Sequence, residues 1–224
     1  MIDRKYKIIY RIWEAEYGPY GLLAVTVFTV FVTSPLVVIG VLDPLFVDAF
    51  FAAFMFIGVL TVHPRPVLRY LVLIAAALAV LIRITSKILP GTLIIISQAV
   101  IDVTAIALFA WLVTKQFLVS ERPPSHRICA AIMVYLFLGM LWSRLYEITG
   151  LMIPGAFHME DGSATVTSYL YFSFVTLATI GYGDISPVHP VARNLSVLEA
   201  ITGQMYIAIL IARLVSTTSN DKQN

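Results

Sequence analysis

Long apolar runs dominate this chain and restrict what it can fold into. Hydrophobic residues make up 59% of the 224 residues and charged residues only 12%, about half the share that a soluble domain carries. A helix needs about 20 mostly apolar residues to cross a bilayer. Six segments meet this requirement, at 21–41, 45–62, 67–84, 91–117, 128–148 and 192–215. The sequence therefore predicts an all-α membrane protein with six transmembrane helices.

Basic residues outside these segments predict the orientation of the chain. Cytoplasmic loops of membrane proteins carry an excess of Lys and Arg. With six spans, one side of the bilayer receives Arg4, Lys5, Lys7, Arg11, Arg65, Arg69, Lys115, Arg122, Arg127, Arg213 and Lys222. Arg83 and Lys87 fall on the other side. Their long side chains can extend along the helix and place the charge at the membrane–water interface. We therefore expect an integral membrane protein with both termini in the cytoplasm.

The distribution of polar residues divides the chain into parts. Residues 1–20 mix basic and aromatic side chains, which predicts an interfacial segment on the inner leaflet; an unstructured cytoplasmic end is the alternative. A four-helix domain at 21–118, a second domain at 126–215 and a short cytoplasmic tail at 216–224 follow. The net charge of +2 predicts membrane lipids rather than nucleic acid as partners.

A polar, glycine-containing loop, TLATIGYGDISP at 176–187, lies between the last two spans. The segment before it, 165–178, is apolar and rich in hydroxyls but too short to span the bilayer. It is predicted to be a re-entrant helix. Within the membrane, non-helical backbone is tolerated only where it is buried in protein or lines a water-filled cavity. Residues 179–183 are therefore expected to line an aqueous path.

The pattern T-x-x-T-x-G-Y-G-D, from Thr176 to Asp184, resembles the selectivity signature of potassium channels. The resemblance extends over 126–215 as a pore domain with an outer helix, a pore helix, a filter and an inner helix, and the inner helix resembles those of prokaryotic members. It implies a passive, potassium-selective channel that forms a homotetrameric pore in a prokaryotic cell membrane, with potassium ions as the permeant ligand. The spans contain no paired carboxylates, nucleophile–base pair or metal-ligand cluster, so we expect no enzymatic activity.

The resemblance assigns roles to the residues of the loop. Potassium would be held by Thr179, Ile180, Gly181 and Tyr182 through backbone carbonyls that replace its water. Carbonyls that all point inward need backbone angles of alternating hand, which glycine adopts at little cost. Support for the filter is expected from Thr176, Gly183, Asp184 and Tyr171. Many relatives have an acid at the position of Val175, so Asp184 is predicted to bond to the Tyr171 hydroxyl instead.

The last span contains the candidates for gating, which are Glu199, Gly203, Gln204, Ile207 and Ile211. Gly203 is expected either to act as a hinge or to permit close packing against the pore helix. Glu199 is predicted to point toward the pore helix, where Ser173 or Thr176 could donate to it. Ile207 and Ile211 are candidates for apolar rings that close the pore.

The four-helix domain resembles a voltage sensor without its charges. Residues 91–114 contain no Lys or Arg, so steep voltage gating is not expected. Asp102 is either functional or bonded to a neighbouring helix. The four histidines, His63, His126, His158 and His189, are interpreted as solvated. A weakly selective cation channel and the pore subunit of a potassium transport complex remain as alternatives, and the sequence gives no gating stimulus.

Overall fold

The computed structural model describes residues 18–43, 74, 77–78, 81–82, 85, 91–115, 124–160, 162 and 164–220. They belong to two compact units, residues 1–141 and residues 142–224, and each unit is described by itself. The predicted span at 45–62 lies outside the described residues, as do most of the span at 67–84 and nearly all of the N-terminal segment at 1–20.

Within the described residues, four helices are long and apolar enough to cross a membrane: Pro19–Val37, Thr92–Val113, Ser125–Met152 and Pro190–Arg213. They coincide with the first, fourth, fifth and sixth predicted spans. A mostly helical protein with apolar, membrane-length helices is therefore confirmed. The count of six spans, the orientation and the four domain boundaries stay predictions.

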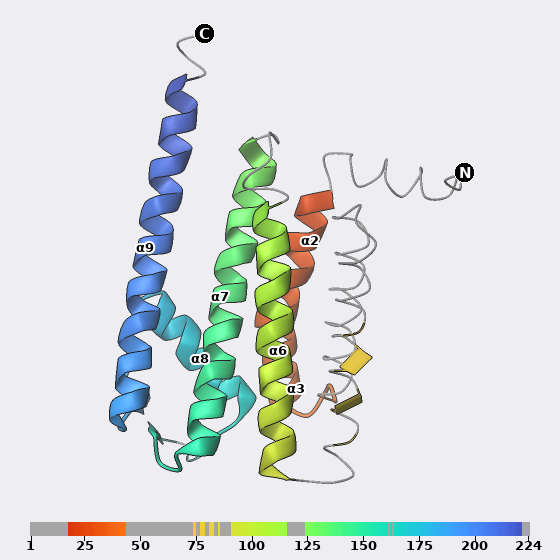
Figure 1. The fold of residues 1–224 in the computed structure, drawn as a ribbon, viewed down its shortest axis with the longest axis vertical. Coiled ribbons are helices and arrows are strands. Elements are labelled where there is room, and N and C mark those ends of the chain that lie inside the picture. The colour runs from red at the N-terminus through yellow and green to blue at the C-terminus, as the bar shows by residue number, and fades with distance from the viewer. Residues whose placement is uncertain are drawn as a thin grey trace, which may run out of the picture. The chain divides into compact units, whose positions relative to one another are not determined.

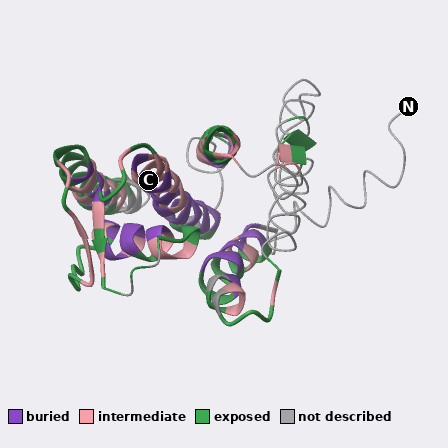
Figure 2. Ribbon diagram, turned by 90° about the horizontal axis from the view of Figure 1, so that it is seen from below, coloured by how far each residue is buried: buried purple, intermediate pink, exposed green. Residues whose placement is uncertain are grey.

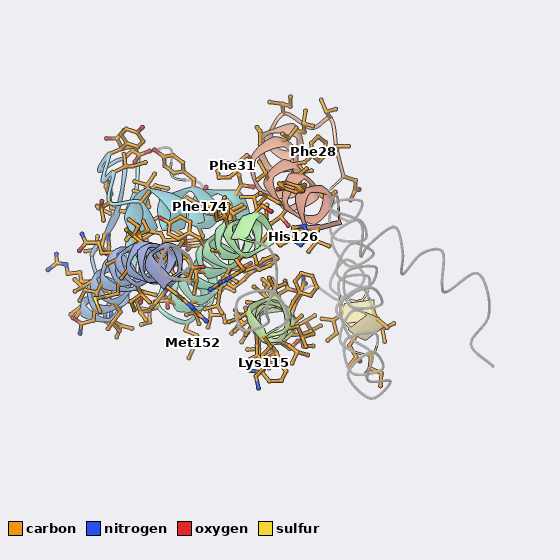
Figure 3. The ribbon with its side chains drawn as sticks, turned by 90° about the horizontal axis from the view of Figure 1, so that it is seen from above. Phe28, Phe31, Lys115, His126, Met152 and Phe174 are labelled. Carbon is orange, nitrogen blue, oxygen red and sulfur yellow. The ribbon has the colours of Figure 1, made fainter. Side chains whose placement is uncertain are left out.

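The first of these spans is built from three consecutive helical pieces, α2 (Gly18–Val27), η1 (Phe28–Thr33) and α3 (Ser34–Val38). Its buried threonines turn their hydroxyls onto their own helix: Thr26 donates to Leu22 O and Thr29 to Val25 O at 2.9 and 2.8 Å. Such bonds satisfy hydroxyls without a partner helix. The π-helical turn of η1 was not predicted from the sequence. It carries exposed Phe28 and Phe31 (Figure 3).

The first unit also contains α6 (Thr92–Val113) and the first part of α7 (Pro124–Met152). Proline suits the start of α7 because the first turn of a helix needs no N–H donor. Phe109 of α6 meets Phe137 of α7 edge to face, with ring centroids 5.3 Å apart. Buried Ala130 and Met133 line the same part of α7. Apolar packing therefore joins α6 to this part of α7.

The second unit holds the end of α7, β1 (Phe157–Met159), α8 (Val166–Leu177), β2 (Ile185–Pro187) and α9 (Pro190–Asn220). The helix predicted at 165–178 is present as α8, and it lies beside the first half of α9 (Figure 1). The aromatic core of the second unit consists of Tyr146, Tyr169 and Phe172. Figure 2 shows in purple the buried residues that α8 contributes.

Candidate ion-conduction site

The N-terminus of α8 is fixed by a side-chain cap. Thr165 lies just before the helix with extended backbone, and its hydroxyl accepts a hydrogen bond from the backbone N–H of Ser168 at 3.1 Å. This bond satisfies one of the N–H groups that a helix start leaves open. The cap sets where α8 begins, and therefore where the chain leaves it twelve residues later.

The C-terminus of α8 leads directly into the predicted filter. The N–H of Ile180 donates to Val175 O at 2.8 Å, and the N–H of Thr179 donates to Thr176 O at 3.0 Å. This pair of bonds is a Schellman motif, which requires left-handed backbone at the residue after the cap. That residue is Thr179, with φ of 56°. A β-branched residue rarely adopts this conformation, so the surrounding bonds hold Thr179 in a strained geometry.

The backbone from 179 to 183 alternates in hand. Thr179, Gly181 and Gly183 have φ of 56°, 65° and 89°, whereas Ile180 and Tyr182 do not have positive φ. Alternation of this kind turns successive carbonyls to the same side of the chain. Glycine at 181 and 183 suits this backbone because a Cβ disfavours the left-handed conformation. The one non-glycine residue with positive φ in the described part of the chain is Thr179.

The filter segment is exposed in the single chain but is held from one side by α8. The Tyr182 side chain is 69% exposed, and its ring stacks on that of Tyr171 with centroids 6.4 Å apart and planes 3° from parallel. The Tyr171 hydroxyl bonds to the Asp184 carboxylate. Partial desolvation and this bond raise the pKa of Tyr171 to about 12, so its hydroxyl remains a donor at neutral pH.

A two-stranded ladder ties the end of the filter to the loop after α7. β1 and β2 are antiparallel, with His158 opposite Ser186 and Met159 opposite Ile185. The N–H of Glu160 also donates to Asp184 O at 3.3 Å. These strands were not predicted, because each is three residues long and is defined by its partner rather than by its own pattern. They fix the backbone where the chain leaves the filter.

Glu199 on α9 is fully buried, at 0% exposure, next to α8. Ser173 of α8 donates to its Oε1 at 2.5 Å, and the Tyr146 hydroxyl of α7 donates to its Oε2. Ser173 was one of two predicted donors. Tyr146 was missed, although a tyrosine within an apolar helix signals a hydroxyl that needs a buried partner.

Gly203, one turn further along α9, lies against the end of α8. A Cβ at this position would collide with the backbone oxygen of Leu177 and would lie 3.1 Å from its Cδ1. The close approach of the two helices therefore accounts for the glycine, in agreement with the packing alternative. Whether α9 also bends at Gly203 stays a prediction.

The other gating candidates lie further along α9 in the same unit. Gln204, Ile207 and Ile211 are all exposed in the single chain, and the two isoleucines are 44% and 56% exposed. Exposed apolar side chains on a membrane helix face lipid or another protein surface. Their role as a gate is not tested by a single chain.

The interpretations of His126 and Asp102 can be compared with the structure. The interpretation of His126 (labelled in Figure 3) as a solvated residue is wrong, because its side chain is 5% exposed. Its ring meets the Tyr20 ring edge to face, with centroids 6.2 Å apart. Its position in the first turn of α7 suggested exposure, but α2 covers it. Asp102 takes part in an interaction within the described residues. Neither residue belongs to a metal-ligand cluster in the described part of the chain.

Comparison with known proteins identifies the class of the second domain. Residues 128–220 match the family described as ion channel, so this part of the chain is similar to an ion channel domain. The chain is 42% identical over 65 residues to two pore potassium channel c of Oryza sativa subsp. japonica. The aligned stretch covers 29% of this chain and 14% of that relative. The chain is 37% identical over 76 residues to inward rectifier potassium channel Kirbac3.1 of Paramagnetospirillum magnetotacticum, covering 34% and 24%.

A further relative is protein LctB of Bacillus caldotenax, 34% identical over 56 residues, which covers 25% of this chain and 41% of the relative. The chain thus spans less than half the length of each of these relatives. No solved structure matches it significantly. The resemblance to potassium channels is confirmed for this domain.

Proposed function

We propose that this protein is the pore-forming subunit of a passive, potassium-selective channel. One observation carries the proposal: the alternating backbone hand from Thr179 to Gly183, held at its start by the Schellman motif of α8. Such backbone turns successive carbonyls to one side, and it lies within the segment that matches the ion channel family. The potassium channels among the similar proteins support potassium as the permeant ion.

The chemistry of the loop follows from what potassium needs. An ion that enters a narrow pore must replace its hydration shell with other oxygens. The backbone carbonyls of residues 179–182 supply these oxygens, together with the Thr179 hydroxyl. A side-chain carboxylate would bind the ion too tightly for rapid exit, whereas neutral carbonyls bind it strongly enough to enter and weakly enough to leave.

A ring of oxygens requires several loops around one axis. One chain contains one such loop, so the pore requires a closed, symmetric assembly, and the resemblance favours a homotetramer. The exposure of the filter in the single chain fits this arrangement, since its carbonyls must face the axis and its neighbours. The C-terminal end of α8, which carries partial negative charge, then points toward permeating cations.

The membrane arrangement completes the proposal. The subunit has six spans, both termini lie in the cytoplasm of a prokaryotic cell, and lipids surround the outer helices. Ile207 and Ile211 from each subunit form apolar rings below the filter that exclude water in the closed state. Gln204 lines the cavity between these rings and the filter.

Recording from the purified full-length protein in liposomes tests the proposal. With potassium on both sides at different concentrations, stepwise currents should reverse at the potassium equilibrium potential. Replacing potassium by sodium on one side should move the reversal potential far from zero. A reversal potential near zero under these bi-ionic conditions indicates the weakly selective cation channel. Transport without stepwise currents indicates the transport-complex subunit.

A further inference from the structure

The buried carboxylate of Glu199 connects three helices of the second unit. Its own helix is α9, the Ser173 donor comes from α8, and the Tyr146 donor comes from α7. Tyr146 is also fully buried and bonds in addition to Ser196, which lies on α9 one turn before Glu199. A polar cluster this enclosed is costly unless every member is satisfied. Its presence beside the filter therefore requires an explanation beyond packing.

The two hydroxyls can both donate to Glu199 when its carboxyl group is ionised. Each oxygen of Glu199 accepts one bond from a hydroxyl. A protonated carboxyl group would need an acceptor for its own proton, and one of the hydroxyls would have to reverse its role. Both hydroxyls are thus placed to stabilise a negative charge on Glu199 in a site shielded from water.

The filter lies close enough to sense this charge. Ser173 lies four residues before Leu177, the last residue of α8, which is about 6 Å along the helix, and the filter segment follows that end. At an effective permittivity of about 20, opposite unit charges roughly 10 Å apart attract with an energy that changes a binding constant about tenfold. Ser173 is part of the helix that ends in the filter, so the bond to Glu199 also fixes the position of that helix.

We propose that Glu199 is an ionised positioning residue: held by Tyr146 and Ser173, it anchors the pore helix α8, and its charge strengthens potassium binding in the filter. The inference rests on the proposed function and extends it to a residue that does not contact the ion. Among the described residues, the groups bonded to the Glu199 carboxylate are the Tyr146 phenol from α7 and the uncharged Ser173 hydroxyl from α8.

The test measures potassium affinity by calorimetry on the purified full-length protein. Glu199→Gln keeps the size of the side chain and its capacity for hydrogen bonds but removes the charge. It should weaken potassium binding about tenfold. Acidification should weaken binding by the wild type and leave Glu199→Gln unchanged, a difference that a purely structural role would not produce. Equal affinity and equal pH profiles in both proteins would overturn the inference.

Two further variants keep the test decisive if Glu199→Gln does not assemble. Tyr146→Phe and Ser173→Ala retain the acid but remove one donor each, and each should weaken potassium binding several-fold. The matched control is Thr202→Val, which removes a hydroxyl bonded to Leu198 O on the same helix and should bind potassium like the wild type. Donor variants that also bind like the wild type contradict the inference. If wild type does not prefer potassium over sodium, the proposed function fails, and this inference fails with it.

Discussion

The two units share one way of satisfying polar side chains, and the second unit adds another. In both units, hydroxyls donate to carbonyls of their own helix, as Ser97 and Thr104 do on α6 and Thr202 does on α9. In the second unit, Ser173 and Tyr146 in addition donate across helices to Glu199. A helix that satisfies its own hydroxyls can be placed against lipid or any apolar neighbour. A helix with bonds to another helix is fixed in position.

Backbone geometry shows the same contrast. Around the filter, left-handed backbone occurs at Thr179, Gly181 and Gly183, and α9 approaches α8 so closely at Gly203 that no side chain fits. Gly21 on α2, by comparison, has open space around it. Strain and close approach persist only where the surroundings enforce them, and they cluster at functional sites. Left-handed backbone also occurs at Gly40 in the first unit, so the contrast rests on the non-glycine residue Thr179 and on the close approach at Gly203.

The largest effect is expected from Gly181→Ala. A Cβ disfavours the left-handed backbone at φ of 65° by about 1–2 kcal/mol, and in the proposed ring every subunit carries the change. Selective potassium current should be lost. The matched control is Gly155→Ala, which imposes the same strain at φ of 77° in the loop between α7 and β1, also with open space around it. Recording should show potassium-selective current in the control; selective current in Gly181→Ala as well would refute the filter assignment.

A smaller effect is expected from Gly203→Ala. The new Cβ would collide with the backbone oxygen of Leu177, so α9 must move away from α8. Overpacking of this kind costs about 1–3 kcal/mol. The purified protein should therefore unfold at a lower temperature than the wild type. Gly21→Ala is the control, since alanine in an open helical position is neutral or favourable by up to about 1 kcal/mol.

Equal destabilisation by the two glycine changes would remove the contrast between the units. Unchanged stability in both would mean that α9 accommodates the Cβ by a small shift, and that Gly203 serves as a hinge rather than as a contact. A hinge would then appear as altered open probability with normal stability.

A still smaller effect is expected from Tyr171→Phe. The change keeps the ring that stacks on Tyr182 but removes the hydroxyl bonded to Asp184. The bond is partly exposed, so its loss should cost about 1 kcal/mol, which corresponds to roughly fivefold faster decay of current during sustained opening. Tyr20→Phe, at an exposed tyrosine of the first unit, should leave the decay unchanged. A decay rate equal to wild type in Tyr171→Phe would show that Asp184 is held by the β1–β2 ladder alone.

The sequence predicted those features that a few residues determine locally. The short helix at 165–178 followed from its apolar run and its flanking hydroxyls, and the left-handed backbone at Gly181 and Gly183 followed from the need for inward carbonyls. The position of Glu199 toward Ser173 followed from helical spacing. In each case the physical requirement acts over one or two turns of chain.

Features that depend on distant partners could not be predicted in this way. The Tyr146 bond joins residues 53 positions apart, and the β1–β2 ladder exists only because residues 157–159 fold back on residues 185–187. His126 was misjudged for the same reason, since its burial comes from Tyr20 on another helix. Left-handed backbone at Thr179 was unexpected because threonine seldom adopts it.

The smallest effect is expected from voltage, and it tests the first unit. Moving one charge through 100 mV supplies about 2.3 kcal/mol, and steep gating needs several charges in each subunit. Within α6, Asp102 is the only charged residue. Lys115 lies beyond the end of α6 with its Nζ 5.0 Å from the centroid of the Trp111 ring (Figure 3), a pairing that anchors it near the interface. Open probability should therefore change little between −100 and +100 mV (roughly the range over which sensors with several charges respond fully), and Asp102→Asn should leave that shallow dependence unaltered. A steep conductance–voltage curve that Asp102→Asn flattens would show that the first unit does sense the field, and the contrast between a generic first unit and a functional second unit would have to be abandoned.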